Sequence, residues 1–208
     1  GVFKNQAKDY DLVINIAPGS SKSTIASILF PAWCWTRMPS FRFIGASYAH
    51  NLAMDLSRKN RDVVLSEEYQ TCFPEIKLRE DQSAKSYFVN TQGGARYTTG
   101  SLGMITGMHS HWIGIDDPIN PKESLSEQVM YQVNNWIKET LSSRKVDRRI
   151  TVTSLIMQRL HQEDPTAQTL KKKRVRHVCI PAELTDDVNP PELRENYKNG
   201  LMDETRLP

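Results

Sequence analysis

The sequence has few cysteines, no long apolar run and no apolar leader at its start. Its three cysteines, Cys34, Cys72 and Cys179, are odd in number, lie far apart and match no metal-ligand spacing. We therefore expect them to be buried core thiols. No stretch approaches the roughly 20 apolar residues that cross a bilayer, and nothing at the N-terminus resembles a signal peptide. These absences favour a soluble, intracellular protein that does not bind a membrane.

Positive and negative side chains are nearly equal in number, 27 Lys and Arg against 24 Asp and Glu. The formal net charge is +3 over 208 residues, which by itself is too small to indicate a nucleic-acid partner. Two basic clusters, at residues 143–149 and 171–177, could contact phosphates. A short run of charge is more commonly a solvated surface, so both interpretations stay open.

Apolar runs of strand length alternate with segments of helical periodicity over about 180 residues. Strands are expected at residues 11–17, 41–47, 111–117, 149–157 and 174–181, with an antiparallel pair within 86–99 that turns at Gly93 and Gly94. Helices are expected at residues 22–35, where Pro31 should kink or end the helix, at 48–70 and at 123–141. This alternation predicts a three-layer α/β domain with a mainly parallel central sheet. Residues 181–208 are rich in proline, asparagine and charge, which indicates a linker or a small lid.

A loop of small residues with a single lysine joins the first predicted strand to the first predicted helix. Free N–H groups and the helix dipole make such a junction an anion site. Lys22 would reach the β- and γ-phosphates of a nucleotide, and the Ser23 hydroxyl would coordinate magnesium. The residues expected to bind the nucleotide are Pro18, Gly19, Ser20, Ser21, Lys22, Ser23 and Thr24. Ser21 stands where the strict phosphate-loop pattern has glycine, so an ordinary turn capped by serine is an equal alternative for the loop alone.

Two adjacent carboxylates end the predicted strand at residues 111–117. Asp116 would hold the magnesium shell, and Asp117 would polarise the attacking water. The alternative is a turn, because Asp and Pro are favoured there. Adjacent acids at the end of a buried strand repel each other, however, and a bound cation would relieve that repulsion. Together with the loop, and with Thr153 and Ser154 on a later strand, they favour a nucleotide site.

These segments resemble, in order and spacing, the ATPase part of the large terminase subunit of tailed phages, the motor that packages double-stranded DNA into procapsids. The resemblance covers almost the whole chain, through NIAPGSSKST, FPAWCW, IGASYAHNLAMDLSRKNRDVV, TTGSLGMITGMHSHWIGIDDPINP and SLIMQRLHQEDPTAQTL. It implies a P-loop NTPase domain of the RecA/ASCE type over residues 1–180, with ATP and Mg²⁺ as cofactors. Residues 181–208 would then lead toward a nuclease domain, so no DNA cutting is expected from this chain.

The same resemblance implies roles for individual residues. Lys22 and Ser23 match the phosphate and magnesium ligands, Asp116 the acid of the magnesium site, and Asp117 the catalytic carboxylate. The pair Thr153 and Ser154 matches the coupling motif that senses the γ-phosphate, and Arg159 matches an arginine near that motif.

Two arginines of the family are absent, one near Gly19 and one near Met108, and one of them could act as a finger toward a neighbouring subunit. The arginines that could replace it as finger or sensor are Arg96, Arg144, Arg148, Arg149 and Arg159.

The partners implied by the resemblance are double-stranded DNA, the portal protein and the small terminase subunit. A homo-oligomeric ring is expected in the active state, with a monomer possible in isolation, in the host cytoplasm during virus assembly. Expected DNA contacts are Lys171, Lys172, Lys173 and Arg174. Two alternatives stay open: another DNA-dependent or helicase-like ATPase, and a nucleotide-gated DNA-binding module that does not hydrolyse ATP.

Overall fold

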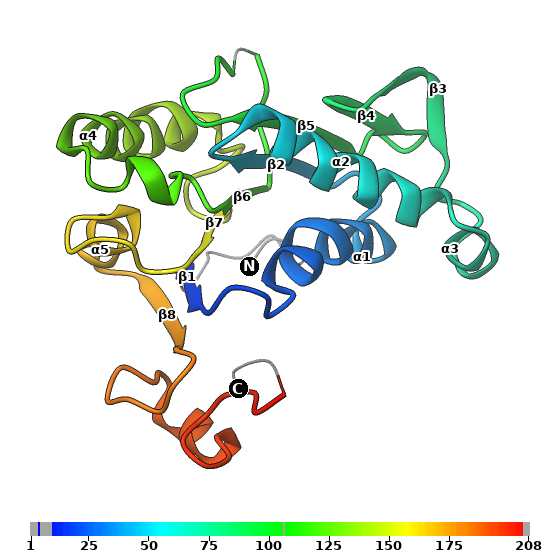
Figure 1. Cartoon of the computed structure of the whole chain (residues 1–208). Helices are drawn as coiled ribbons and strands as arrows, with labels where there is room; N and C mark the ends of the chain where they lie inside the picture. Colours follow the sequence, from blue (N-terminus) through cyan, green and yellow to red (C-terminus); the bar gives the residue numbers. More distant parts are fainter. Residues whose placement is uncertain (1–3, 5–9, 106, 206–208) are drawn as a thin grey trace.

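A computed structural model describes residues 4, 10–105 and 107–205 of the chain. Its strands form one sheet in the order β3-β4-β5-β2-β6-β7-β1-β8 (Figure 1). The strands are β1 (Asp11–Ile16), β2 (Arg42–Ser47), β3 (Leu78–Ala84), β4 (Tyr87–Asn90), β5 (Ala95–Gly100), β6 (Trp112–Asp116), β7 (Val152–Met157) and β8 (Val175–Ile180). Strand β4 pairs antiparallel with β3 and β5, and every other pair is parallel. The predicted mainly parallel α/β architecture is confirmed.

Helices cover both faces of this sheet, and Figure 1 shows α1 and α2 on one side with α4 and α5 on the other. The α-helices are α1 (Phe30–Arg37), α2 (His50–Leu65), α3 (Glu67–Cys72), α4 (Glu127–Asn135) and α5 (Pro165–Leu170). Six-residue π-helical segments, Thr24–Leu29 and Trp136–Leu141, directly precede α1 and follow α4. Three short 3₁₀ turns complete the described elements, at Pro121–Glu123, Ser142–Arg144 and Pro191–Asn196. None of the described helices has the length and apolar character needed to cross a membrane.

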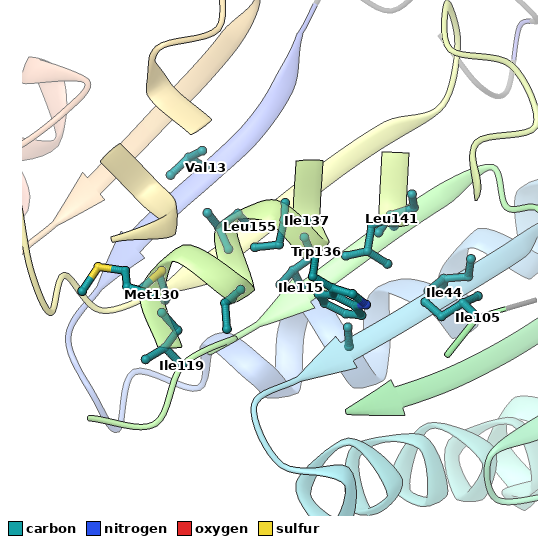
Figure 2. Close-up of a cluster of buried hydrophobic side chains, with 14 residues drawn as sticks. Val13, Ile44, Ile105, Ile115, Ile119, Met130, Trp136, Ile137, Leu141 and Leu155 are labelled. Carbon is teal, nitrogen blue, oxygen red and sulfur yellow. The ribbon is translucent and has the colours of Figure 1, made fainter. Parts of the chain in front are cut away.

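The side chains of strand β6 pack into two separate hydrophobic clusters. Its Ile113 and Ile115 are fully buried against the π-helical segment after α4, in the cluster drawn in Figure 2. Trp112 packs instead on the cluster formed by α1, β2 and α2. Because side chains alternate along a strand, Asp116 shares the α1 face with Trp112. The last residue of β6 thus meets the helix that follows the predicted phosphate loop.

Several predicted elements differ from the structure in detail. The helix expected at 22–35 does not end at Pro31, because a π-helical segment precedes it and α1 continues to Arg37. The helix expected at 48–70 breaks at Ser66, whose hydroxyl accepts the Tyr69 N–H and starts α3. Strand β3 and helix α5 were not predicted. The expectation that all cysteines are core thiols is wrong for Cys72, which is exposed at the end of α3.

The chain beyond β8 folds back onto that strand. Cys179 and Asn189 exchange two backbone hydrogen bonds, and the Tyr197 hydroxyl donates to the Pro181 carbonyl. In Figure 1 this segment, coloured orange to red, lies beyond β8 at one end of the sheet. Strand β8 ends at Ile180, and a domain boundary after that residue stays a prediction.

Candidate active site

The loop between β1 and the first helix has the backbone shape of an anion cradle. Gly19 has φ 76° and Ser21 has φ 59°, and the helix begins at Lys22. Pro18 and Ser20 lie in the same loop, where the Ser20 hydroxyl donates to the Ala17 carbonyl at 2.7 Å. A left-handed non-glycine residue costs on the order of 1 kcal/mol. Backbone strain of this kind is concentrated at ligand sites. Ser21, which stands where the strict pattern has glycine, adopts this left-handed conformation, so the loop forms without that glycine.

Two acids at the end of β6 meet the start of this helix. The Lys22 ammonium lies 3.2 Å from Asp117 Oδ2. The Ser23 hydroxyl donates to Asp116 Oδ1 at 3.1 Å, and the Ser27 hydroxyl donates to Oδ2 at 2.7 Å. Residues 93 positions apart are therefore in direct contact. The structure brings together the predicted phosphate-binding lysine, the predicted magnesium serine and both predicted acids.

Asp117 is held in a strained conformation by its neighbours. Its φ is 45°. Its N–H donates to the Ile156 carbonyl at 2.8 Å, and its own carbonyl accepts the Tyr48 N–H at 2.9 Å. These bonds join the carboxyl ends of β7 and β2 to the residue after β6. A non-glycine residue with positive φ that is fixed from both sides is typical of functional positions.

Asp116 is a buried carboxylate, with 3% of its surface exposed. Burial raises its pKa, and the hydrogen bonds from Ser27 and Ser23 oppose that shift. Serine hydroxyls and carboxylates are oxygen ligands of the kind that Mg²⁺ prefers. These residues therefore fit a magnesium ion.

Within the described ranges, no cluster of three or more His, Cys, Asp or Glu side chains could hold a metal by itself. A magnesium ion at this place would keep waters and substrate phosphates among its ligands, as is usual for nucleotide enzymes.

Arg96 lies inside the protein on β5, with 2% of its surface exposed. Its guanidinium stands over the Phe43 ring at 5.3 Å from the centroid and donates to the Ser27 carbonyl at 2.7 Å. Burial lowers its pKa to about 9, while the charge of Asp116 opposes the shift. Its burial contradicts the finger role predicted for Arg96, because a buried side chain cannot reach the nucleotide of a neighbouring subunit, whereas the sensor role stays a prediction.

Thr153 and Ser154 lie near the start of β7, away from the two acids. In the sheet they pair with Ile113 and Gly114, whereas Asp116 pairs with Ile156. The Ser154 hydroxyl accepts the Trp112 indole N–H at 2.9 Å. Ile156 lies three positions after Thr153 along the strand, which is about 10 Å. The prediction that these hydroxyls sense the γ-phosphate is wrong, because only residues at the carboxyl ends of parallel strands reach this edge of the sheet.

The other predicted arginines lie at different edges. Arg159 follows β7 on the same edge as Asp117, where its guanidinium pairs with Asp164 at 2.9 Å. Arg148 is exposed in the connection before β7, at the opposite edge, and is flanked there by Arg144 and Arg149. Arg148 therefore cannot reach the phosphate loop of its own chain, and a role toward another subunit stays a prediction.

The predicted DNA-contact residues form an exposed turn between α5 and β8. All four, Lys171 to Arg174, are exposed, and Lys171 pairs with Glu163 at 3.2 Å. This turn also precedes a parallel strand, so it lies at the opposite edge of the sheet from Lys22.

Ser27 is a site residue that the sequence reasoning missed. Its signal was the serine four positions after Ser23, which a helix places on the same face.

A cavity of about 400 Å³ adjoins the phosphate loop. Residues 17–20 line one side, and Ala182, Met202 and Asp203 line the other. The loop therefore borders a space shared with the segment beyond β8.

Solved structures of two phage proteins share this fold. The large terminase of bacteriophage HK97 superposes with a TM-score of 0.56 at 13% identity, over 95% of this chain and 41% of that one. The large terminase of a thermophilic bacteriophage gives 0.53 at 12% identity, over 94% and 46%. This chain thus spans less than half of either protein. No family model and no curated protein sequence matches it. The fold of this chain is that of the phage large terminases.

Proposed function

We propose that this chain hydrolyses ATP with the help of Mg²⁺ and is the motor domain that drives double-stranded DNA into a viral procapsid. The observation that carries the proposal is the meeting of Lys22 with Asp117, and of Ser23 with Asp116, at one edge of the sheet. The terminase fold supports the packaging role. The remaining parts of the proposal are a homo-oligomeric ring, the portal protein and small terminase subunit as partners, and the host cytoplasm as the site of action.

The chemistry follows from the position of each group. Lys22 and the loop N–H groups would stabilise the negative charge on the phosphoryl group that is transferred. The Lys22 ammonium lies 3.2 Å from the Asp117 carboxylate. When the ammonium turns to the phosphates, the carboxylate would accept a hydrogen bond from the attacking water instead. Ser23 and Asp116 would hold Mg²⁺, which supplies positive charge between the phosphate oxygens. The cavity between the loop and Met202 would admit the base and the sugar.

A phosphate-release assay tests hydrolysis at this site. We expect Lys22→Ala and Asp117→Asn each to lower the rate about 100-fold or more, the usual cost of losing one charge-stabilising group. The matched control is Lys59→Ala, which also removes a lysine from an ion pair, since Lys59 lies 2.7 Å from Asp55 on the exposed face of α2. The control should keep the wild-type rate, with and without duplex DNA. Equal phosphate release by all four proteins would exclude this site.

The same assay separates the second candidate, a nucleotide-gated DNA-binding module. The ion pair of Lys22 with Asp117 favours this candidate, because the two charges stabilise each other even in a protein that does not hydrolyse ATP. Nucleotide binding that depends on Lys22, without phosphate release by the wild-type protein on duplex DNA, would support that candidate instead.

A further inference from the structure

Pro31 leaves a carbonyl of the first helix without its usual donor. In an α-helix the carbonyl of Ser27 would accept the N–H of residue 31, but proline has no N–H and its ring pushes that carbonyl outward. The chain is π-helical here, as the bond from the Phe30 N–H to the Ile25 carbonyl shows. Short π-helical segments of this kind are frequent at functional sites.

Arg96 supplies a side-chain donor to the Ser27 carbonyl, which the N–H of an ordinary residue 31 would reach only in an α-helical turn. Its Nη1 donates to the Ser27 carbonyl at 2.7 Å from strand β5. Gly45 makes room for it, because a Cβ on that residue would stand 3.2 Å from Arg96 Nη2. The guanidinium lies against the Phe43 ring, and its Nε donates to the Thr98 hydroxyl at 3.4 Å. Two hydrogen bonds and the ring contact thus hold the guanidinium in place.

The residue that Arg96 holds is the one that orients Asp116. The Ser27 carbonyl accepts from Arg96, while the Ser27 hydroxyl donates to Asp116 Oδ2 at 2.7 Å. The other oxygen of that carboxylate accepts from Ser23. A continuous polar path therefore runs from β5 to the proposed magnesium ligands. We propose that Arg96 is a positioning residue for the metal of the ATP site, acting through Ser27 on the Asp116 carboxylate. This inference rests on the proposed function.

Metal binding by the whole chain tests the inference, with Mn²⁺ as the probe. Binding is measured by electron paramagnetic resonance in the presence of a non-hydrolysable ATP analogue. We expect Arg96→Met to raise the Mn²⁺ concentration at half-saturation about 10-fold or more, as is typical when support of a metal ligand is lost. Binding of the same analogue without metal should change less than about twofold, because Lys22 and the loop are untouched. Arg96→Lys keeps a cationic donor and should restore most of the metal affinity.

Asn60→Ala is the matched control. Asn60 is also buried, and its side-chain amide donates at 2.7 Å to the neighbouring carbonyl, that of Ile28. Ile28 has no contact with the acids among those described, so this variant should keep wild-type Mn²⁺ affinity. If Asn60→Ala and Arg96→Met weaken Mn²⁺ binding equally, Arg96 merely supports the helix and the inference is wrong.

A double variant separates the hydrogen bond from general packing. Ser27→Ala removes the hydroxyl that joins Arg96 to Asp116, so Arg96→Met combined with Ser27→Ala should weaken Mn²⁺ binding no more than Ser27→Ala alone. Additive losses in the double variant would contradict the path through Ser27. If Arg96→Met does not fold, Gly45→Ala tests the same step, because its Cβ would stand 3.2 Å from Arg96 Nη2 and the guanidinium would have to shift by a few tenths of an ångström from its bond to Ser27. Unchanged Mn²⁺ affinity in that variant would overturn the inference.

The outcome for the wild-type protein distinguishes the two proposals. A wild type that binds neither the analogue nor its Mn²⁺ complex refutes the ATP site itself. A wild type that binds both, with Arg96→Met indistinguishable from it, refutes only the role of Arg96.

Discussion

Replacing Ser27 by alanine removes one of the two hydroxyls that donate to Asp116. The bond is 2.7 Å long, and both side chains are buried. Leaving a buried charged acceptor short of a donor costs about 1–3 kcal/mol. For a chain of this length, each kcal/mol lowers the midpoint of thermal unfolding by about 2–4 °C. We therefore expect Ser27→Ala to unfold roughly 2–12 °C below the wild type at neutral pH.

The loss should depend on pH, and its sign follows from Asp116. Burial raises the pKa of this carboxyl in the folded state, and the Ser27 bond opposes the shift, so Ser27→Ala raises that pKa further. Between the unfolded pKa, about 3.9, and the folded pKa, the folded state binds more protons than the unfolded state. Stability then falls as the pH rises through that window. Ser27→Ala should accordingly cost less at about pH 4, where more of the folded-state carboxyl carries a proton, than at about pH 8.

Thermal unfolding followed by circular dichroism at both pH values measures this difference. Ser57→Ala is the control, because Ser57 is fully buried on α2 and its hydroxyl has no hydrogen-bond partner among the described residues. That substitution should be neutral or slightly stabilising at either pH. A cost of Ser27→Ala that is the same at both pH values, or that Ser57→Ala matches, would refute the reasoning.

Three further predictions concern separate parts of the molecule. Gly114→Ala should cost about 1–3 kcal/mol in urea unfolding, since its Cβ would stand 2.7 Å from the Phe43 ring; an unchanged midpoint would contradict this contact. Reversing the charges of Lys171–Arg174 should weaken binding to duplex DNA and flatten its salt dependence, whereas an unchanged slope in fluorescence anisotropy would leave the turn as plain surface. A thiol reagent should modify exposed Cys72 well before Cys34, whose pKa burial raises; mass spectrometry showing equal rates would contradict that burial.

The candidate site could be predicted where its residues lie at the ends of readable elements. Lys22 and Ser23 begin the helix after a buried strand, and Asp116 ends another, so parallel pairing alone brings them to one edge. Thr153 and Ser154 were predicted wrongly because they do not lie at the end of their strand. The family resemblance implied a role at the phosphates for them, but β7 continues three residues past Ser154, and its register with β6 places them near the far edge.

The role of Arg96 could not be read from the sequence at all. Because an arginine side chain is normally exposed, the sequence predicted Arg96 as a finger or sensor. Its burial depends on Gly45, Phe43 and Ser27, which lie on other elements 51 to 69 positions away in the sequence. The sequence by itself determined the alternation of strands and helices and the positions of the small-residue loop and the two acids at element ends, because these depend on local periodicity and on residues at element ends. Only the tertiary structure decided which side chains meet behind the acids, since strand order and register are set by packing between distant segments.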